Sequence, residues 1–474
     1  MLLFLGLACS LGVTPWVPCE SGRECRDAFG FGQTCGEAGY CVAVDRQARC
    51  DSTWPEDLLV RPEEYNGALI VGSLYDHTTD IPERQATRLA VKQADQSQGV
   101  DGHTVGLVQC SYEEDQVLDG LTSDEAAVEM ANYLADDLGA FAIVGPATSG
   151  VTEAVYNGLP TDGPLLVSPS ATSPALSYLD EPDRPEGGAG RLWRTAPPDS
   201  LQGEVLATLV ETRLGNGNQH VALVYQTGPY GDGLAEVFVA NWSAANRVAD
   251  RYPFENDTQR STAASSAAAP TYDAIIFISS DLPDVTAFLE SIAVDEDAAE
   301  IPIFLADAAR DAELLAQTKN TDAEALWPNV TGTAPAVPSG NQYDAFNSAY
   351  SGEYEGESAD DSSYSAYAYD AAWLTMYGAS WALANEPALN GQNAAEGLRH
   401  ITDKAADSIE VGPVTWNQVQ AAFAVGEDID ARGASGTLDY DPETEETTGP
   451  IEVWGIGYDD DDSPTFLVLT TVEP

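Results

Sequence analysis

The stretch FAIVGPATSGVTEAVYNGLPTDGPLLVSPSAT, residues 141–172, contains two short apolar runs separated by one helical segment and a turn. It predicts buried strands at 141–144 and 165–167, with a tight turn at Gly145-Pro146 and a helix between the strands. A strand–helix–strand unit of this kind is typical of a parallel sheet. The stretch therefore predicts an α/β fold.

Both loops of this unit follow the carboxyl ends of the predicted strands, where parallel sheets bind their ligands. The first loop leads into a helix that opens at Thr148 or Ser149, and the free N–H groups there favour an anion such as a carboxylate. The second loop offers Ser170 and Thr172, whose hydroxyls both donate and accept hydrogen bonds. On these residues alone, a ligand site and a set of simple helix N-caps remain equally open.

The alternation of apolar runs and helical periods continues on both sides of this stretch. Strands are expected at 68–74, 105–110, 220–225, 274–279 and 301–305, and helices at 82–96, 122–138, 200–214, 233–245 and 283–292. Because the pattern forms two successive series that divide near residue 198, it predicts two doubly wound lobes with parallel sheets.

One expected helix, 363–384, carries an aromatic stripe of Trp373, Tyr377 and Trp381 at helical spacing. Such a stripe could line a ligand cleft, but we favour a core face. Near the end of the chain, strands are expected around the Asp-rich turn 458–463. We interpret this turn as a solvated hairpin tip rather than a calcium site.

Length and charge limit the class of protein. A chain of 474 residues exceeds the usual size of one domain, which favours two lobes with a small appendage. The chain has 20 Lys and Arg residues and 77 Asp and Glu residues, so its formal net charge is -57. Nucleic acid is an improbable partner because it is negatively charged as well. The acids are scattered over the whole chain, so we favour a surface adapted to salt over an acidic substrate trap or calcium binder.

The first nine residues, MLLFLGLAC, are apolar and end in a small residue before Cys9. This pattern suggests a bacterial lipoprotein signal in which Cys9 is lipidated. No other run approaches the roughly 18 apolar residues that a membrane span needs. We therefore expect a protein of the periplasm or outer cell envelope that is lipid-anchored and does not span the membrane.

The remaining cysteines form an even set, which indicates disulfides and an oxidising compartment. They are Cys19, Cys25, Cys35, Cys41, Cys50 and Cys110. The spacing of the first four lacks the close pairs of a zinc site and predicts a small disulfide knot, with three connectivities open. Cys50 precedes the first strand of the main domain and Cys110 ends the second, so we expect these two to pair, with a free buried Cys110 as the alternative.

Sequence signatures of catalysis are missing. The four histidines, at 77, 103, 220 and 400, form no H-E-x-x-H pair. The chain has no G-x-x-x-x-G-K-[ST] phosphate loop, no G-x-S-x-G elbow and no G-x-G-x-x-G after a strand. We therefore expect no enzyme, no catalytic residue, no cofactor and no metal site.

Four motifs in order carry a family resemblance. They are GPATSG at 145–150, SPSATSPAL at 168–176, RLWRTAPPDSLQG at 191–203 and YQTGPYGDGL at 225–234. Together they resemble the type I periplasmic binding proteins, and within these the branched-chain amino acid and amide binding proteins of ABC importers. The resemblance covers about residues 66–470 and implies two lobes, joined by three crossover strands, that close on a ligand between them.

The resemblance also implies a ligand set on the first lobe. In that family the residues that match Ser149, Ser170 and Thr172 hold the α-carboxylate and ammonium of the ligand. The loop after the first strand differs from the Pro-x-Thr-Gly turn of relatives, and Tyr75 is assigned to the ligand set at this place.

The second lobe is expected to close over the ligand. The aromatic residue of the family's Y-G-x-G-L motif does so in relatives, and here it is Tyr230. Asp307, after the run IPIFL, is the nearest match for the acid that meets the ammonium, with Asp281 as second choice.

These inferences give a domain division and a function. The expected parts are a signal segment at 1–9, a cysteine-rich module at 10–55, a first lobe at 66–197 and 333–436, and a second lobe at 198–332 and 437–474. The expected function is a cell-envelope solute-binding lipoprotein that captures an amino acid or small amide for an ABC permease. The alternative is a surface sensor or interaction lipoprotein that keeps the fold without transport.

The charge balance predicts a response to salt. If the -57 charge is an adaptation to a saline habitat, raising salt from dilute buffer to molar concentration should raise the melting temperature, because screening reduces self-repulsion. Thermal unfolding followed by circular dichroism checks this. A melting temperature that stays constant or falls would contradict the salt-adaptation hypothesis.

Overall fold

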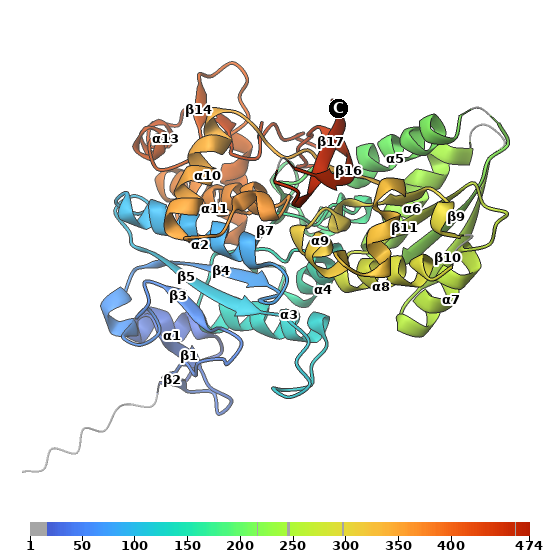
Figure 1. Ribbon diagram of the computed structural model, residues 1–474. Helices are drawn as coiled ribbons and strands as arrows, with labels where there is room; N and C mark the ends of the chain where they lie inside the picture. Colours follow the sequence, from blue (N-terminus) through green and yellow to red (C-terminus); the bar gives the residue numbers. More distant parts are fainter. Residues whose placement is uncertain (1–16, 216, 244–246, 296–297, 460) are drawn as a thin grey trace, which may run out of the picture.

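The structure is a computed structural model that describes residues 17–474, except 216, 244–246, 296–297 and 460. It has two lobes, each built on a mainly parallel sheet, and a small disulfide-linked module at the N-terminal end (Figure 1). The predicted fold class, with its two doubly wound lobes, is thus confirmed.

The first sheet has the strand order β3-β5-β4-β6-β7-β8, in which only β3 runs antiparallel to its neighbour. Its strands are β3 (Ser52–Trp54), β4 (Leu69–Tyr75), β5 (Val105–Ser111), β6 (Ala142–Val144), β7 (Leu165–Ser168) and β8 (Leu192–Arg194). The helices of this lobe are α2 (Ile81–Gln96), α3 (Ser123–Asn132), α4 (Ser149–Gly158), α10 (Asn341–Glu353), α11 (Ser365–Asn385), α12 (Gly391–Gly397) and α13 (Trp416–Phe423). A two-stranded sheet of β14 (Ser408–Glu410) and β15 (Asp430–Arg432) lies beside them.

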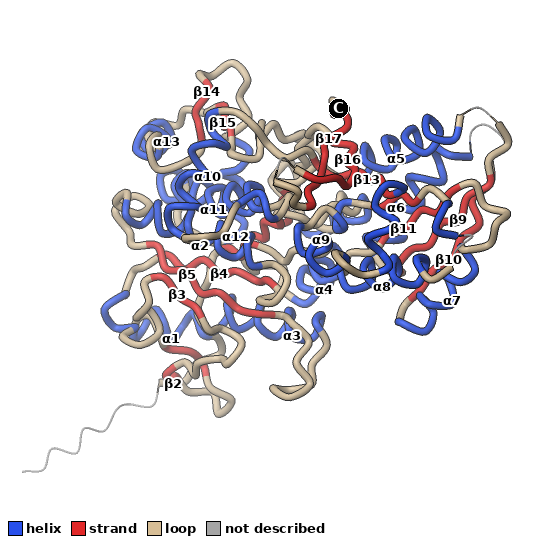
Figure 2. The backbone as a smooth tube through the Cα atoms, in the orientation of Figure 1, coloured by secondary structure: helices blue, strands red, loops and turns tan. Residues whose placement is uncertain are grey.

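The second sheet has the order β10-β9-β11-β12-β13-β16-β17, and its last two strands are antiparallel. Its strands are β9 (His220–Gln226), β10 (Val248–Phe254), β11 (Ala274–Ile278), β12 (Ile303–Leu305), β13 (Val330–Pro335), β16 (Ile451–Tyr458) and β17 (Pro464–Val472). Its helices are α5 (Asp199–Leu214), α6 (Pro229–Trp242), α7 (Asp257–Ala267), α8 (Leu282–Ala293) and α9 (Ala312–Thr318). Helices flank both sheets, as Figure 2 shows.

Strand residues point alternately to two apolar cores, as a sheet covered on both faces requires. In β6, Ala142 and Val144 pack into the core that contains α2 and α11, whereas Ile143 packs into the core of α3 and α4. The long helix α11 is buried along most of its length. It joins the first lobe although it follows the second-lobe strands in the sequence, so the chain crosses between the lobes.

The aromatic stripe on α11 belongs to the core, which confirms the predicted packing role. Trp373 and Tyr377 are fully buried, and both contact Trp416 of α13. At the end of the chain, the strands β16 and β17 form the expected hairpin. In its turn, the Asp459 carboxylate accepts hydrogen bonds from the backbone N–H groups of Asp461 (2.9 Å) and Ser463 (2.8 Å).

The predicted helix at 122–138 is a shorter α-helix followed by a wider turn. Thr122 and Glu125 form the reciprocal capping box that starts α3. The α-helix ends at Asn132, and a π turn continues the chain through Asp137. Among the described residues, no helix has both the length and the apolar character needed to cross a membrane.

The N-terminal module consists of α1 (Gly22–Phe29), β1 (Gln33–Cys35) and β2 (Cys41–Ala43). Disulfides join Cys19 to Cys35 and Cys25 to Cys41, which selects one of the three open connectivities. A third disulfide joins Cys50 to Cys110 at the edge of the first sheet. Cys9 and the expected signal segment lie outside the described residues.

The disulfide between Cys50 and Cys110 spans 60 residues, so it restricts the unfolded chain strongly. Replacing both cysteines by alanine should lower the free energy of unfolding by about 3–4 kcal/mol. Urea denaturation checks this, with the Cys19→Ala, Cys35→Ala pair as control, because that disulfide lies in the small module. Equal losses of stability in the two pairs, or none in the first, would contradict the prediction.

Candidate functional site

The loops after β6 and β7 are tied to each other by hydroxyl groups. Thr148 is the N-cap of α4, and Ser149 is the first residue of the helix. The Ser149 hydroxyl accepts a hydrogen bond from the backbone N–H of Ser173 (3.1 Å), and Ser170 donates to the carbonyl oxygen of Ala147 (2.9 Å). The capping role therefore belongs to Thr148, while Ser149 and Ser170 join the two loops.

A glycine makes the close approach at the first loop possible. Gly145 has φ of +95°, and a Cβ atom there would lie 2.3 Å from the carbonyl oxygen of Leu74. A side chain is excluded both by this contact and by the backbone conformation. The turn brings the start of α4 over the end of β4.

Thr172 is the predicted hydroxyl that lies beside an acid of the second lobe. Its side chain is fully buried, and its hydroxyl acts as a hydrogen-bond partner of the Asp199 carboxyl, whose pKa it lowers. The loop around it is held by Arg194, which donates to the carbonyl oxygens of Ala171 (3.1 Å) and Ser173 (2.8 Å). A threonine hydroxyl both donates and accepts, so Thr172 is suited to contact a ligand as well as Asp199.

Arg194 also connects this loop to the segment that crosses into the second sheet. Its guanidinium pairs with the carboxylate of Glu446. Burial lowers the pKa of Arg194 to about 10, against the opposing effect of nearby acids, so the side chain stays charged at neutral pH.

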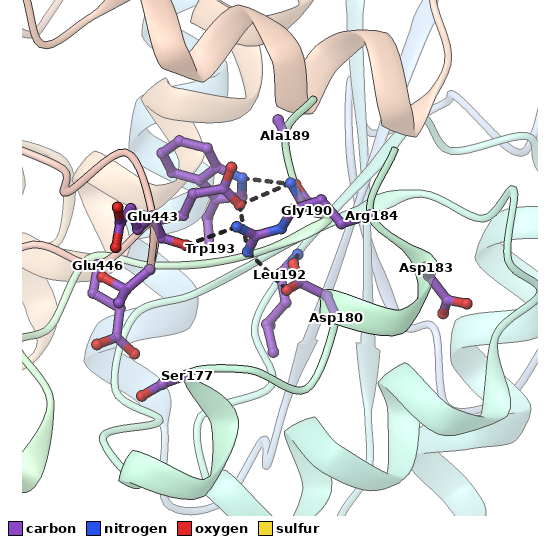
Figure 3. Close-up of polar contacts among 12 residues, drawn as sticks. Ser177, Asp180, Asp183, Arg184, Ala189, Gly190, Leu192, Trp193, Glu443 and Glu446 are labelled. Carbon is purple, nitrogen blue, oxygen red and sulfur yellow. Dashed lines mark hydrogen bonds and ion pairs between the residues drawn. The ribbon is translucent and has the colours of Figure 1, made fainter. Parts of the chain in front are cut away.

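The neighbouring Glu445 fixes the same segment by a second set of contacts, close to the ion pair between Arg184 and Asp180 that Figure 3 shows. Its buried carboxylate accepts from the backbone N–H of Gly190 (2.8 Å) and pairs with Arg184 (3.1 Å) and Arg399 (3.0 Å). Arg184 pairs with Asp180 as well (3.0 Å). Sequence reasoning missed this network because Glu445 lies 255 residues from Gly190 along the chain.

Asp307, the predicted acid, lies just after β12 and is nearly buried. One carboxylate oxygen accepts from Gln202 (2.8 Å) and from the hydroxyl of Tyr230, and the other accepts from the hydroxyl of Tyr364 (2.5 Å). Gln202 and Tyr230 belong to the second lobe, whereas Tyr364 immediately precedes α11 of the first. The carboxylate of Asp307 therefore joins the two lobes.

A second contact between the lobes lies beside the predicted loops. The Ser173 hydroxyl donates to the carbonyl oxygen of Pro229 (2.6 Å), in the first turn of α6. Because Tyr230 follows Pro229, this bond places the loop of Thr172 against the helix that carries Tyr230. The structure thus brings Ser149, Ser170 and Thr172 to the part of the second lobe that holds Tyr230 and Asp307.

Asp199, which sequence reasoning missed, lies in the same place. It is the first residue of α5, and its backbone N–H donates to the carbonyl oxygen of Thr172 (2.9 Å). Both oxygens of its carboxylate are buried, and the Thr172 hydroxyl beside them lowers the pKa of Asp199. Burial and the nearby charge of Asp307 raise the pKa of Asp199 well above its usual range.

Tyr75 is not brought together with this group. It is fully buried in the core under α2, and its hydroxyl lies 3.0 Å from the Thr87 hydroxyl. Asp281, the second choice for the acid, is exposed and accepts from the side chain of Gln226 (2.7 Å). The positions therefore favour Asp307 over Asp281 and give Tyr75 a packing role.

Comparisons with known proteins show the family of this chain. The family model described as the receptor family ligand binding region matches residues 82–458. The chain is 26% identical over 366 residues to the chemotactic signal transduction system substrate-binding protein BasB of Halobacterium salinarum, covering 77% of this chain and 80% of that protein.

Solved structures share the fold. The branched-chain amino acid transporter substrate-binding protein LivJ from Streptococcus pneumoniae, in complex with isoleucine, superposes with a TM-score of 0.63 at 20% identity, covering 86% of this chain and 100% of that chain. A solute-binding protein of an ABC transporter from R. palustris, in complex with 4-hydroxybenzoate, has a TM-score of 0.62 at 15% identity, covering 86% and 97%.

The hydrogen bond from Tyr364 to Asp307 predicts a loss of stability on its removal. Tyr364→Phe should lower the free energy of unfolding by about 1.5–3 kcal/mol, the usual contribution of a hydrogen bond to a charged group. The matched control is Tyr440→Phe, because within the described residues the buried Tyr440 hydroxyl has no hydrogen-bond partner. Urea denaturation of both variants checks this, and equal effects would show that the bond to Asp307 contributes nothing.

Proposed function

The chain belongs to the family of receptor ligand-binding regions and has the type I periplasmic binding fold, and from this premise we propose that it captures a small amino acid or amide between its lobes. The observation that carries the proposal is the contact between the loop of Thr172, on the first lobe, and the second lobe, where α6 carries Tyr230 and the Tyr230 hydroxyl donates to Asp307. We propose binding without catalysis.

The proposed ligand set is Ser149, Ser170 and Thr172 on the first lobe with Tyr230 and Asp307 on the second. A ligand that contacts both groups gains interactions only when the lobes lie together. Its differential contacts therefore favour the closed arrangement over an open one, as any shift between two states requires.

We assign the chain to solute capture for an ABC importer, because the solved proteins that share its fold carry that description. The proposed domain division is the one expected from the sequence. The first lobe comprises 66–197 and 333–436, the second comprises 198–332 and 437–474, and the cysteine-rich module 10–55 precedes them. A lipid on Cys9 anchors the protein to the cell envelope.

A sensor role is the second candidate, and one observation favours it. The relative BasB is described as the substrate-binding protein of a chemotactic signal transduction system, and the similarity covers 80% of its length. Permease genes beside the coding gene would favour transport, and genes of a signal transduction system would favour sensing. The ligand site is the same in both cases.

A ligand screen tests the shared part of both proposals. At least one of the twenty amino acids should raise the melting temperature, because binding at 100 times Kd stabilises a protein by about 2.7 kcal/mol. Thr172→Ala should abolish this shift, since it removes a hydroxyl of the proposed ligand set. The matched control is Thr286→Ala, whose hydroxyl bonds to Gln317 on the surface of the second lobe. No shift with any amino acid, amide or short peptide would overturn a solute-binding role.

A further inference from the structure

The last strand of the chain, β17, forms one edge of the second sheet, where Figure 1 shows it in red beside β16. Within the described residues, its backbone forms no hydrogen bond outside the hairpin with β16. In an antiparallel ladder, alternate N–H and C=O groups point away from the partner strand. The outer side of this nine-residue strand therefore presents a row of donors and acceptors to which a further strand can pair.

The opposite edge of the same sheet is protected by its side chains. The strand there, β10, carries Asp250, Arg251 and Pro253. Charged residues discourage the addition of another strand, and a proline has no N–H to offer to it. The two edges of one sheet therefore differ in their readiness to pair.

Both edges of the first sheet are protected in another way. The edge strands β3 and β8 have only three residues each, and side chains already bond to their backbones. Arg88 donates to the carbonyl oxygen of Thr53 (2.8 Å), and Asp180 accepts from the N–H of Leu192 (3.1 Å). By contrast, β17 has no charged residue, and its single proline, Pro464, stands at the first position. Of the four edges of the large sheets, β17 is thus the one that is long and uncharged.

Three consecutive apolar side chains of β17 are exposed. They are Leu467 at 43%, Val468 at 53% and Leu469 at 56% of their full exposure. The two leucines lie over glycines of β16, since a Cβ atom at Gly455 would lie 3.5 Å from Leu469 and one at Gly457 would lie 2.4 Å from Leu467. The leucines thus cover the backbone of β16 and leave an exposed apolar patch along the free edge. Patches of this kind mark sites of interaction with other proteins.

The charges at the two ends of the strand indicate what the patch receives. Asp461 and Asp462 are exposed in the turn before β17, and the exposed Glu473 follows its last residue. The guanidinium of Arg310 lies against β17, but it is already paired with Glu452. A strand with basic ends complements this arrangement. A second copy of the chain would instead bring its own acids, and a further net charge of -57, against these acids.

We propose that the free edge of β17 is a docking site for an extended segment of another polypeptide, apolar in its centre and with lysine or arginine at its ends. The segment adds an eighth strand to the second sheet. Main-chain hydrogen bonds hold it, the exposed apolar patch contacts its centre, and the acids at the two ends of β17 fix its position. This inference goes beyond the proposed function and does not depend on it, because β17 contributes no residue to the proposed ligand set.

Peptide binding to the full chain tests the proposal. The probe is the end-capped, fluorescein-labelled peptide KTVTVTVTK, whose binding is followed by anisotropy at low salt. Two matched peptides serve as controls. KTVTPTVTK has the same charge but a central proline that interrupts strand pairing, and ETVTVTVTE has acidic ends.

The expected result is saturable binding of KTVTVTVTK and at least 10-fold weaker binding of each matched peptide. Equal binding of the proline peptide would show attraction to the acidic surface alone, and equal binding of the acidic peptide would remove the role of the basic ends. Either result, or no binding of KTVTVTVTK, overturns the proposal.

A pair of variants tests the position of the site. Val468→Lys places a cation in the middle of the docking edge and should weaken binding of KTVTVTVTK at least 10-fold. The matched control is Val248→Lys, because Val248 lies on β10 at the opposite edge of the same sheet and is 51% exposed. Both variants change the net charge equally, so Val248→Lys should bind as the unaltered protein does. Equal affinities of the two variants would overturn the site on β17.

Hydrogen exchange measured by mass spectrometry locates the peptide on the unaltered protein. Saturating KTVTVTVTK should slow the exchange of backbone amides in 464–472 and leave those in 248–254 unchanged. Slower exchange elsewhere, with none in 464–472, would overturn the proposal. This measurement stands even if Val468→Lys fails to fold.

Sedimentation velocity tests whether a second copy of the chain covers the edge instead. The unaltered protein should sediment as a monomer. A dimer that Val468→Lys dissociates and Val248→Lys does not would show that β17 pairs with itself, and it would overturn the basic segment as the partner.

Discussion

The buried guanidinium of Arg194 is the interaction on which the geometry of the site depends. It holds the carbonyl oxygens on either side of Thr172 and pairs with Glu446 in the segment that leads into the second sheet. Breaking a buried ion pair by removing one partner costs about 3–5 kcal/mol, because the other charge is left uncompensated. The loop of Thr172, the end of β8 and the segment of Glu446 are therefore fixed together by one side chain.

Other buried acids of this chain show what a purely structural carboxylate looks like. Asp370 on α11 accepts hydrogen bonds from the backbone N–H groups of Ala434 (2.9 Å) and Ser435 (2.7 Å), and burial raises its pKa to about 6. Glu83 is bonded by Ser362, and burial raises its pKa to about 8. Both carboxyls have donors that fix a loop or a helix. Asp199 differs in that only the hydroxyl of Thr172 lowers its pKa by hydrogen bonding, and burial raises that pKa well above its usual range.

The raised pKa values of Asp370 and Glu83 also set the sign of their effect on stability. In the folded state each group binds its proton more tightly than in the unfolded chain. Their contribution is therefore greatest at acidic pH and declines as pH rises through about 6 and about 8, respectively. Buried acids thus oppose folding at neutral pH, and the apolar cores on both faces of the two sheets must offset them.

The sequence by itself determined the strands, the two-lobed fold and the small-hydroxyl loops, because apolar periodicity and capping residues act over a few positions. It also indicated Asp307 and Tyr230 through a family resemblance. Only the tertiary structure showed that Tyr75 faces the core and that Asp199 lies beside Thr172. A strand pattern does not tell which face meets a ligand, and the contacts of Asp199 come from segments far apart in the chain, which only the packing of two lobes brings together.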